Sequence, residues 1–193
     1  AVGSGTQIAK ANADVVLMGD QLNGLPYALN LAKKAKVVLA VGHIERYNPV
    51  ITYVKNSLNE GIWGNLISIA SRRISTFPER ISDVGVIFDT AIHDIDILRY
   101  LSGGEIVSVY SLGGDFRETG KEDHVSILMN STTGIKCICE ASWLTPMKVR
   151  EIGITTDSHY IKIDLIKQEI DVCKSLIQNF DKSKAFDKKM KFT

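Results

Sequence analysis

The feature that most constrains the fold is a block of alternating segments that extends from Ile106 to Cys173. Hydrophobic and polar residues alternate within each segment, and turn-forming sequences such as Asn130–Gly134 and Thr156–Ser158 separate the segments. A period of two is typical of strands with one buried and one solvated face. The predicted strands are Ile106–Leu112, His124–Met129, Ile135–Trp143, Val149–Thr155, His159–Leu165 and Glu169–Cys173. The block therefore predicts a largely antiparallel sheet.

Helical patterns precede this block. Asn48 or Pro49 opens a helix that runs to about Glu60, because proline suits the first helical turn. A second, apolar helix covers Val86–Leu101, and Gly103–Gly104 ends it. Further predicted elements are a buried strand at Val37–Val41, a strand at Leu66–Ser71 and a short α/β segment in residues 1–36, which resembles an incomplete Rossmann half. The predicted fold class is α+β, with the helices on one face of the sheet.

Charge and cysteine content exclude several classes of partner. The formal net charge is +1, so no electrostatic argument favours nucleic acid or an anionic membrane. No apolar run approaches the roughly 18 residues that span a bilayer. Cys137, Cys139 and Cys173 match neither a disulfide framework nor a zinc signature, so we expect reduced thiols, no metal site and a cytoplasmic protein. Residues 174–193 form a basic tail.

The densest group of reactive side chains lies between Gly85 and Asp96. Asp89 and His93 are four residues apart, which places them on one face of a regular helix and within mutual reach. A carboxylate beside an imidazole orients it, and such a pair accepts a proton from an alcohol. The alternative is structural, because acidic residues at the start of a helix also stabilise its dipole. The spacing alone leaves both interpretations open.

Two stretches together resemble the glucose–fructose oxidoreductase/inositol dehydrogenase (Gfo/Idh/MocA) family. The first, Asp83–Leu101, has the glycine, the D-x-x-x-H pattern and the following acidic residue of that family. The second is V-G-H-I-E-R-Y-N-P, residues 41–49, which resembles the family's exit from the last cofactor-domain strand. The similarity covers about Val37 to Cys173, so the chain is identified as a member that carries the C-terminal substrate domain.

The resemblance implies roles for individual residues. It implies Asp89 and His93 as catalytic residues, with His93 holding or deprotonating a sugar hydroxyl, and Arg46 and Asn48 as cofactor-binding residues. It also implies a substrate that is a small sugar or a sugar nucleotide such as a UDP-sugar, and NAD or NADP as the cofactor of the parent family. Substrate contacts are expected from Arg72, Arg73, Arg80 and Asp94. Arg72 and Arg73 could equally form an exposed strand end.

The first 36 residues do not resemble the rest of that family. The family's dinucleotide-binding loop and its Glu-Lys-Pro segment are not recognisable, and residues 3–18 resemble the end of a P-type ATPase phosphorylation domain without its catalytic motifs. We therefore expect three parts, 1–36, 37–173 and 174–193, in a fragment or chimera. This chain is expected to bind no cofactor and to be inactive by itself as a dehydrogenase.

A second hypothesis assigns the chain no chemistry. In this alternative it is a binding or oligomerisation module, or an engineered chimera without an evolved function. The resemblance implies sheets that pack face to face between subunits, so a homo-oligomer through the sheet is expected. Trp143 and Tyr160 are then expected on the sheet face rather than in a pocket.

Overall fold

The computed structural model describes residues 25–37, 42–79, 81 and 83–174. The chain divides into two compact units, Ala1–Ile44 and Glu45–Thr193. In the first unit the described helix is α2, Leu25–Ala35, whose last turn carries Lys33 and Lys34, where cations interact favourably with the helix dipole. The predictions for residues 1–24, for most of the Val37–Val41 strand and for residues 175–193 lie outside the described residues. The three predicted parts of the chain stay predictions.

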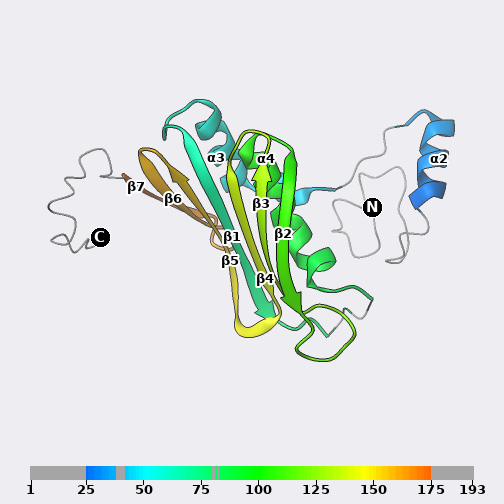
Figure 1. Ribbon diagram of the computed structural model, residues 1–193. Helices are drawn as coiled ribbons and strands as arrows, with labels where there is room; N and C mark the ends of the chain where they lie inside the picture. The colour runs from blue at the N-terminus through cyan, green and yellow to red at the C-terminus, as the bar shows by residue number, and fades with distance from the viewer. Residues whose placement is uncertain (1–24, 38–41, 80, 82, 175–193) are drawn as a thin grey trace. The chain divides into compact units, whose positions relative to one another are not determined.

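The second unit is an α+β fold built on a seven-stranded sheet (Figure 1). The short helix η2, Ile44–Tyr47, leads into it. Its strands are β1 Leu66–Thr76, β2 Ile106–Gly114, β3 His124–Ser131, β4 Lys136–Ser142, β5 Leu144–Thr156, β6 His159–Asp164 and β7 Glu169–Lys174. Its longer helices are α3, Pro49–Asn59, and α4, Ile92–Ser102, and Figure 1 shows both on the same side of the sheet. The predicted fold class is confirmed.

The strand order is β2-β3-β4-β1-β5-β6-β7. All neighbours pair antiparallel except β1 and β4, which run parallel with Ser68 opposite Lys136 and Ile74 opposite Ser142. The sheet is therefore largely antiparallel, as predicted, with one parallel pair at its centre that alternation could not reveal. That pair brings the carboxyl ends of β1 and β4 to the same edge of the sheet.

The core lies between the sheet and the helices. Alternate strand residues point into it and are almost fully buried: Ile69, Ile127, Cys137, Cys139, Ile152, Ile154, Ile161 and Ile163. Val54 from α3 and Ile97 and Leu98 from α4 are fully buried in the same cluster. Burial of each such side chain contributes roughly 1.5–3 kcal/mol, so this face of the sheet is the main source of stability.

The segment before α4 is not a regular α-helix. Residues Ile87–Ala91 form a π-helical turn, and α4 continues from Ile92 until Gly103, whose φ of 71° ends the helix in the left-handed region. Glu122 fixes the start of the turn, because its carbonyl oxygen accepts from the Val86 amide and its carboxylate from the Ile87 amide. A Cβ atom at Gly85 would collide with that carboxylate, so a larger residue would require Glu122 to move.

Candidate functional site

A cavity of about 270 Å³ opens beside the carboxyl ends of β1 and β4. Its wall comes from the end of β1, the turn before α4, the β4–β5 connection and the start of β5. The lining residues are Arg73, Ile74, Ser75, Thr76, Pro78, Asp89, Thr90, Trp143, Lys148 and Arg150. The parallel β1–β4 pair creates this site. Both strands end at the same end of the sheet, and the segments that follow them run in different directions. Two predicted site residues, Asp89 and Arg73, line it.

A chain of hydrogen bonds holds Asp89. The indole nitrogen of Trp143 donates to Thr90 Oγ1 over 2.9 Å, and the Thr90 hydroxyl donates to Asp89 Oδ2 over 3.0 Å. The indole N–H is a donor only, so the Thr90 proton is left for the carboxylate. Trp143 is 4% exposed and packs edge-on against Phe77, with ring centroids 5.4 Å apart. The prediction of Trp143 as a sheet-face residue was therefore wrong, because its ring closes the cavity instead.

His93 lies one helical turn beyond Asp89 and is half-buried. In the described part of the chain no hydrogen bond or ion pair joins the two side chains, and Asp89 acts on His93 only through its charge. The expected direct contact assumed 3.6 residues per turn, whereas the π turn at Ile87–Ala91 changes the angular spacing that stacks residues four apart. The structure thus places the two residues near each other without pairing them.

Arg73 and Asp94 form a buried ion pair behind the cavity. Two nitrogens of Arg73 donate to the Asp94 carboxylate over 2.9 and 3.0 Å, and a third donates to Glu45 over 3.1 Å. The Arg73 and Asp94 side chains are only 5% and 2% exposed. These contacts tie α4 to β1 and η2, so they fix the orientation of the helix that carries His93. Direct substrate contact by Arg73 and Asp94 stays a prediction.

Arg46 and Asn48 have partners within the chain. Arg46 donates to Asp96 over 2.8 Å through Nε and forms a second bond through Nη2, and its guanidinium lies 5.1 Å from the centre of the Tyr100 ring. The Asn48 side chain accepts from the Val50 amide and caps α3. Their predicted cofactor contacts stay predictions. In this structure the Arg46 guanidinium bonds to Asp96 and the Asn48 side chain bonds to the Val50 amide.

The structure separates Arg72 from the cavity. Successive strand residues point to opposite faces, so Arg72 lies on the face that the helices leave open, where it pairs with Glu140 over 2.9 Å. Arg72 and Glu140 are both well exposed, with 54% and 43% of their side-chain surface accessible. Arg80, the remaining predicted substrate contact, lies outside the described residues.

Lys148 and Arg150 also line the cavity, and neither was predicted as a site residue from the sequence. Arg150 lies opposite Arg73 in the β1–β5 ladder, and Glu45 lies between them, 3.8 Å from Arg150. The Lys-x-Arg spacing at the start of a strand puts both cations on one face. That spacing could have indicated a pair of cations on one face, but the predicted strand began at Val149 and so left Lys148 out.

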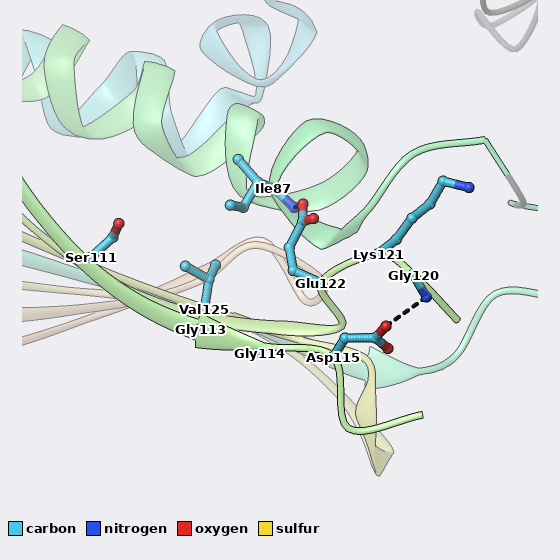
Figure 2. Close-up of a pocket in the computed structure, with 9 residues that line it drawn as sticks. All are labelled: Ile87, Ser111, Gly113, Gly114, Asp115, Gly120, Lys121, Glu122 and Val125. Atoms are coloured by element: carbon cyan, nitrogen blue, oxygen red, sulfur yellow. Dashed lines mark hydrogen bonds between the residues drawn. The ribbon is translucent and has the colours of Figure 1, made fainter. Parts of the chain in front are cut away.

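A larger hollow of about 460 Å³ lies at the other end of the turn, beside β2 and the loop that follows it (Figure 2). None of the predicted site residues lines it. Figure 2 shows Asp115 bonded to the Gly120 amide and Glu122 directed at Ile87. Both carboxylates thus stabilise the loop and the turn, and we regard the smaller cavity as the candidate site despite its size.

We expect His93 to titrate below its ordinary value. Burial lowers the pKa of His93 below 6.5, and the positive charge of Arg73 lowers it further, whereas the nearby carboxylates act in the opposite direction. The unfolded chain therefore takes up this proton first, so stability declines as pH falls from about 6.5 to the folded-state pKa. Proton NMR of the imidazole checks this, with the urea-unfolded chain as control. A folded-state midpoint at or above 6.5 would contradict it.

Among the described helices, none combines the length and the apolar character needed to cross a membrane. Within the same residues, no group of histidine, cysteine, aspartate and glutamate side chains is arranged to hold a metal ion.

Known proteins share both the sequence and the fold of this region. The chain is 28% identical over 144 residues to a UDP-N-acetylglucosamine 3-dehydrogenase of Acidithiobacillus ferrooxidans, covering 75% of this chain and 44% of that protein. It is 31% identical over 123 residues to an inositol 2-dehydrogenase of Rhizobium meliloti, covering 59% and 37%. The chain thus spans less than half the length of these curated relatives.

A solved structure gives the same fold. The WlbA dehydrogenase from Bordetella pertussis, in complex with NADH and UDP-GlcNAcA, superposes with a TM-score of 0.69 at 20% identity, over 87% of this chain and 56% of that one. The model of the GFO/IDH/MocA C-terminal domain matches residues 51–161, more than half of the 193 residues. The chain therefore belongs to the Gfo/Idh/MocA family of oxidoreductases, and its residues 51–161 correspond to the C-terminal domain of that family.

Proposed function

We propose that this chain supplies the substrate-binding half of an NAD(P)-dependent sugar dehydrogenase. The observation that carries the proposal is Asp89 in a cavity, held by the Thr90 hydroxyl, one turn before a half-buried histidine of lowered pKa. Perturbed titratable groups beside a concave site support a binding or catalytic role. The relatives named above, which act on a UDP-sugar and on inositol, support a sugar or the sugar ring of a sugar nucleotide as ligand.

In this proposal Asp89 and His93 accept hydrogen bonds from two hydroxyls of the same sugar. Because its pKa is lowered, His93 is neutral at pH 7 and can accept a hydrogen bond or a proton from one of them. Asp89 accepts a second sugar hydrogen bond with the oxygen lone pairs that Thr90 does not use. The Arg73–Asp94 pair positions α4 behind them.

The cofactor belongs to the proposed parent enzyme, in which NAD or NADP would accept the hydride. We propose that the described residues do not complete a cofactor site by themselves, since Arg46 is paired with Asp96 and Asn48 caps α3. No step of this proposal therefore passes through a cofactor bound by this chain. We propose that the chain alone binds sugar and performs no oxidation.

Calorimetric titration of the purified chain tests the proposal. We expect UDP-N-acetylglucosamine to bind saturably and NAD and NADP to give no binding. Asp89→Asn should weaken sugar binding about 10- to 100-fold, because a hydrogen bond to a charged group contributes roughly 1.5–3 kcal/mol. The matched control is Glu140→Gln, which removes an exposed carboxylate from the opposite face of the sheet and should leave the affinity unchanged.

Three outcomes contradict parts of this proposal. The absence of sugar binding would contradict the binding role. Equal affinities of Asp89→Asn and the native chain for the sugar would show that Asp89 does not contact it. Production of NADH from NAD and a sugar nucleotide by this chain would show that it completes a cofactor site.

A second proposed role is assembly through the open face of the sheet. Tyr110, Leu128 and Ile138 lie side by side across β2, β3 and β4, and they are 62%, 50% and 44% exposed. Ala70 and Gly153 continue this row with small residues across β1 and β5. Contiguous exposed apolar residues favour an interface. We propose that a second copy of this chain covers the row.

Sedimentation velocity tests the assembly role. Leu128→Glu should shift the chain from dimer to monomer, because the new carboxylate would be buried without a partner in the interface. The matched control is Ile166→Glu in the β6–β7 turn, where the side chain is 48% exposed and away from the row. A native chain that sediments as a monomer over the accessible concentration range would contradict this role.

The cysteines support a reducing location. All three are free, and burial raises the pKa of Cys137 to about 11 and that of Cys139 to about 12, so these thiols stay protonated and unreactive. Proteins with unpaired thiols are typical of reducing compartments. We therefore propose the cytoplasm as the location.

A further inference from the structure

A bulge in β5 forms part of the cavity wall. In the β1–β5 ladder Ile74 faces Val149 and Thr76 faces Leu144, so Ser75 alone opposes the segment from Thr145 to Lys148. The Thr145 hydroxyl donates to the Met147 carbonyl over 3.0 Å and so stabilises the bulge. Bulges bend a strand and redirect its side chains, and they are frequent beside functional sites. Lys148 is the last residue of the bulge and lines the cavity.

The cations of this wall differ in how well they are neutralised. Arg73 is fully engaged by Asp94 and Glu45. Among the described residues, Arg150 forms an ion pair only with Glu45, at 3.8 Å, and its side chain is 39% exposed. Within the described residues Lys148 has no acidic group in ion-pair range. Burial lowers the pKa of Arg150 and the facing Arg73 lowers it further, whereas Glu45, Asp94 and Asp89 act in the opposite direction.

The carboxylate and hydroxyl groups that line the cavity come from elements other than β5, which carries its two cations. Among the described residues that line the cavity, Asp89 is the only one with a carboxylate, and Ser75, Thr76 and Thr90 add hydroxyls. Lys148 and Arg150 come from β5, whereas Asp89 comes from the turn before α4. The cavity therefore has a cationic wall and a separate carboxylate wall.

We propose that Lys148 and Arg150 form an anion subsite that binds a phosphate or carboxylate group attached to the sugar. This inference rests on the proposed function, that the cavity binds a sugar. The cavity of about 270 Å³ is slightly smaller than the roughly 300–1,000 Å³ that is usual for ligand sites, so it suits one ring with a charged substituent. Arg150 supplies a planar fork suited to either anion, and Lys148 adds a point charge.

NMR titration of the chain with three monosaccharides tests the subsite. The probes are glucose, glucuronic acid, which carries a carboxylate, and glucose 1-phosphate, which carries a phosphate. We expect at least one charged sugar to bind about tenfold more tightly than glucose, and this difference should shrink as salt increases. A preference for one charged probe identifies which anion the subsite selects.

Variants separate this subsite from the rest of the cavity. Lys148→Met and Arg150→Met should each remove most of the preference for the charged sugar and leave glucose binding unchanged. The matched control is Lys136→Met, an exposed lysine on the open face, which should keep the full preference. Lys148 is exposed, so its variant should fold normally, and an unchanged unfolding curve verifies this.

Failure of the sugar-binding role and failure of the anion subsite give different results. If none of the three sugars binds, the proposed function fails and the subsite fails with it. If all three bind equally, or if Lys148→Met and Arg150→Met keep the preference, the sugar-binding role stands and the anion subsite is overturned.

Discussion

Replacing Arg73 by methionine should lower the free energy of unfolding by about 3–5 kcal/mol, because the Asp94 carboxylate would remain buried without its partner. Asp94 is 2% exposed and receives two hydrogen bonds from Arg73, so no solvent screening offsets the loss. Urea denaturation monitored by circular dichroism measures the change. An unaltered m-value would show that the native and unfolded states expose the same surface as before.

The adjacent arginine is a matched control. Arg72→Met should cost less than about 1 kcal/mol, because the exposed Arg72–Glu140 pair is screened by solvent. The double variant Arg73→Met/Asp94→Leu should recover part of the loss, since apolar groups often replace a buried pair without penalty. Equal costs for the two single arginine variants would show that the buried pair is not a source of stability.

Trp143→Ala should destabilise the fold by about 3–5 kcal/mol, the usual cost of removing a large buried aromatic side chain. Trp143→Phe should cost only about 0.5–1.5 kcal/mol, because it keeps a ring against Phe77 and removes the hydrogen bond to Thr90. Both values come from urea denaturation. Sugar binding should also weaken in Trp143→Phe, since Thr90 then holds Asp89 less firmly.

Tyr160→Ala is the control for this second prediction. Tyr160 is 46% exposed on the open face, so its removal should cost less than about 1 kcal/mol in the monomer. A loss for Trp143→Ala no larger than that for Tyr160→Ala would contradict the burial of the indole. A Trp143→Phe variant with native sugar affinity would contradict the positioning of Asp89 by this hydrogen-bond chain.

Most strands could be predicted because alternation reports burial directly. The segment predicted at Glu169–Cys173 is observed at Glu169–Lys174, and that at His159–Leu165 is observed at His159–Asp164. The start of β5 was missed because its bulge, which contains Pro146, breaks the period of two. The parallel β1–β4 pair could not be predicted either, since alternation identifies a strand's faces but not its neighbours.

The candidate site was predictable in part for a similar reason. The D-x-x-x-H pattern located the turn that carries Asp89 and His93, but apolar spacing does not distinguish a π turn from an α-helix. Arg72 and Arg73 must point to opposite faces, yet the sequence alone does not say which one is covered. Only the fold shows that Asp94 and Glu45 meet Arg73. The partners of Trp143 and Arg150, which are Thr90 and Glu45, are also remote along the chain.

The place of β1 at the centre of the sheet also affects how the chain assembles. Its neighbours are β4 and β5. Leu66 therefore cannot pair until Thr156, its partner at the far end of β5, has been synthesised. During synthesis the β2–β3 pair can form early, but β1 stays without a neighbour until most of the domain has left the ribosome. Such non-local pairing slows folding and exposes an apolar strand to incorrect partners. A nascent chain stalled before β5 should therefore depend on chaperones far more than one stalled after it.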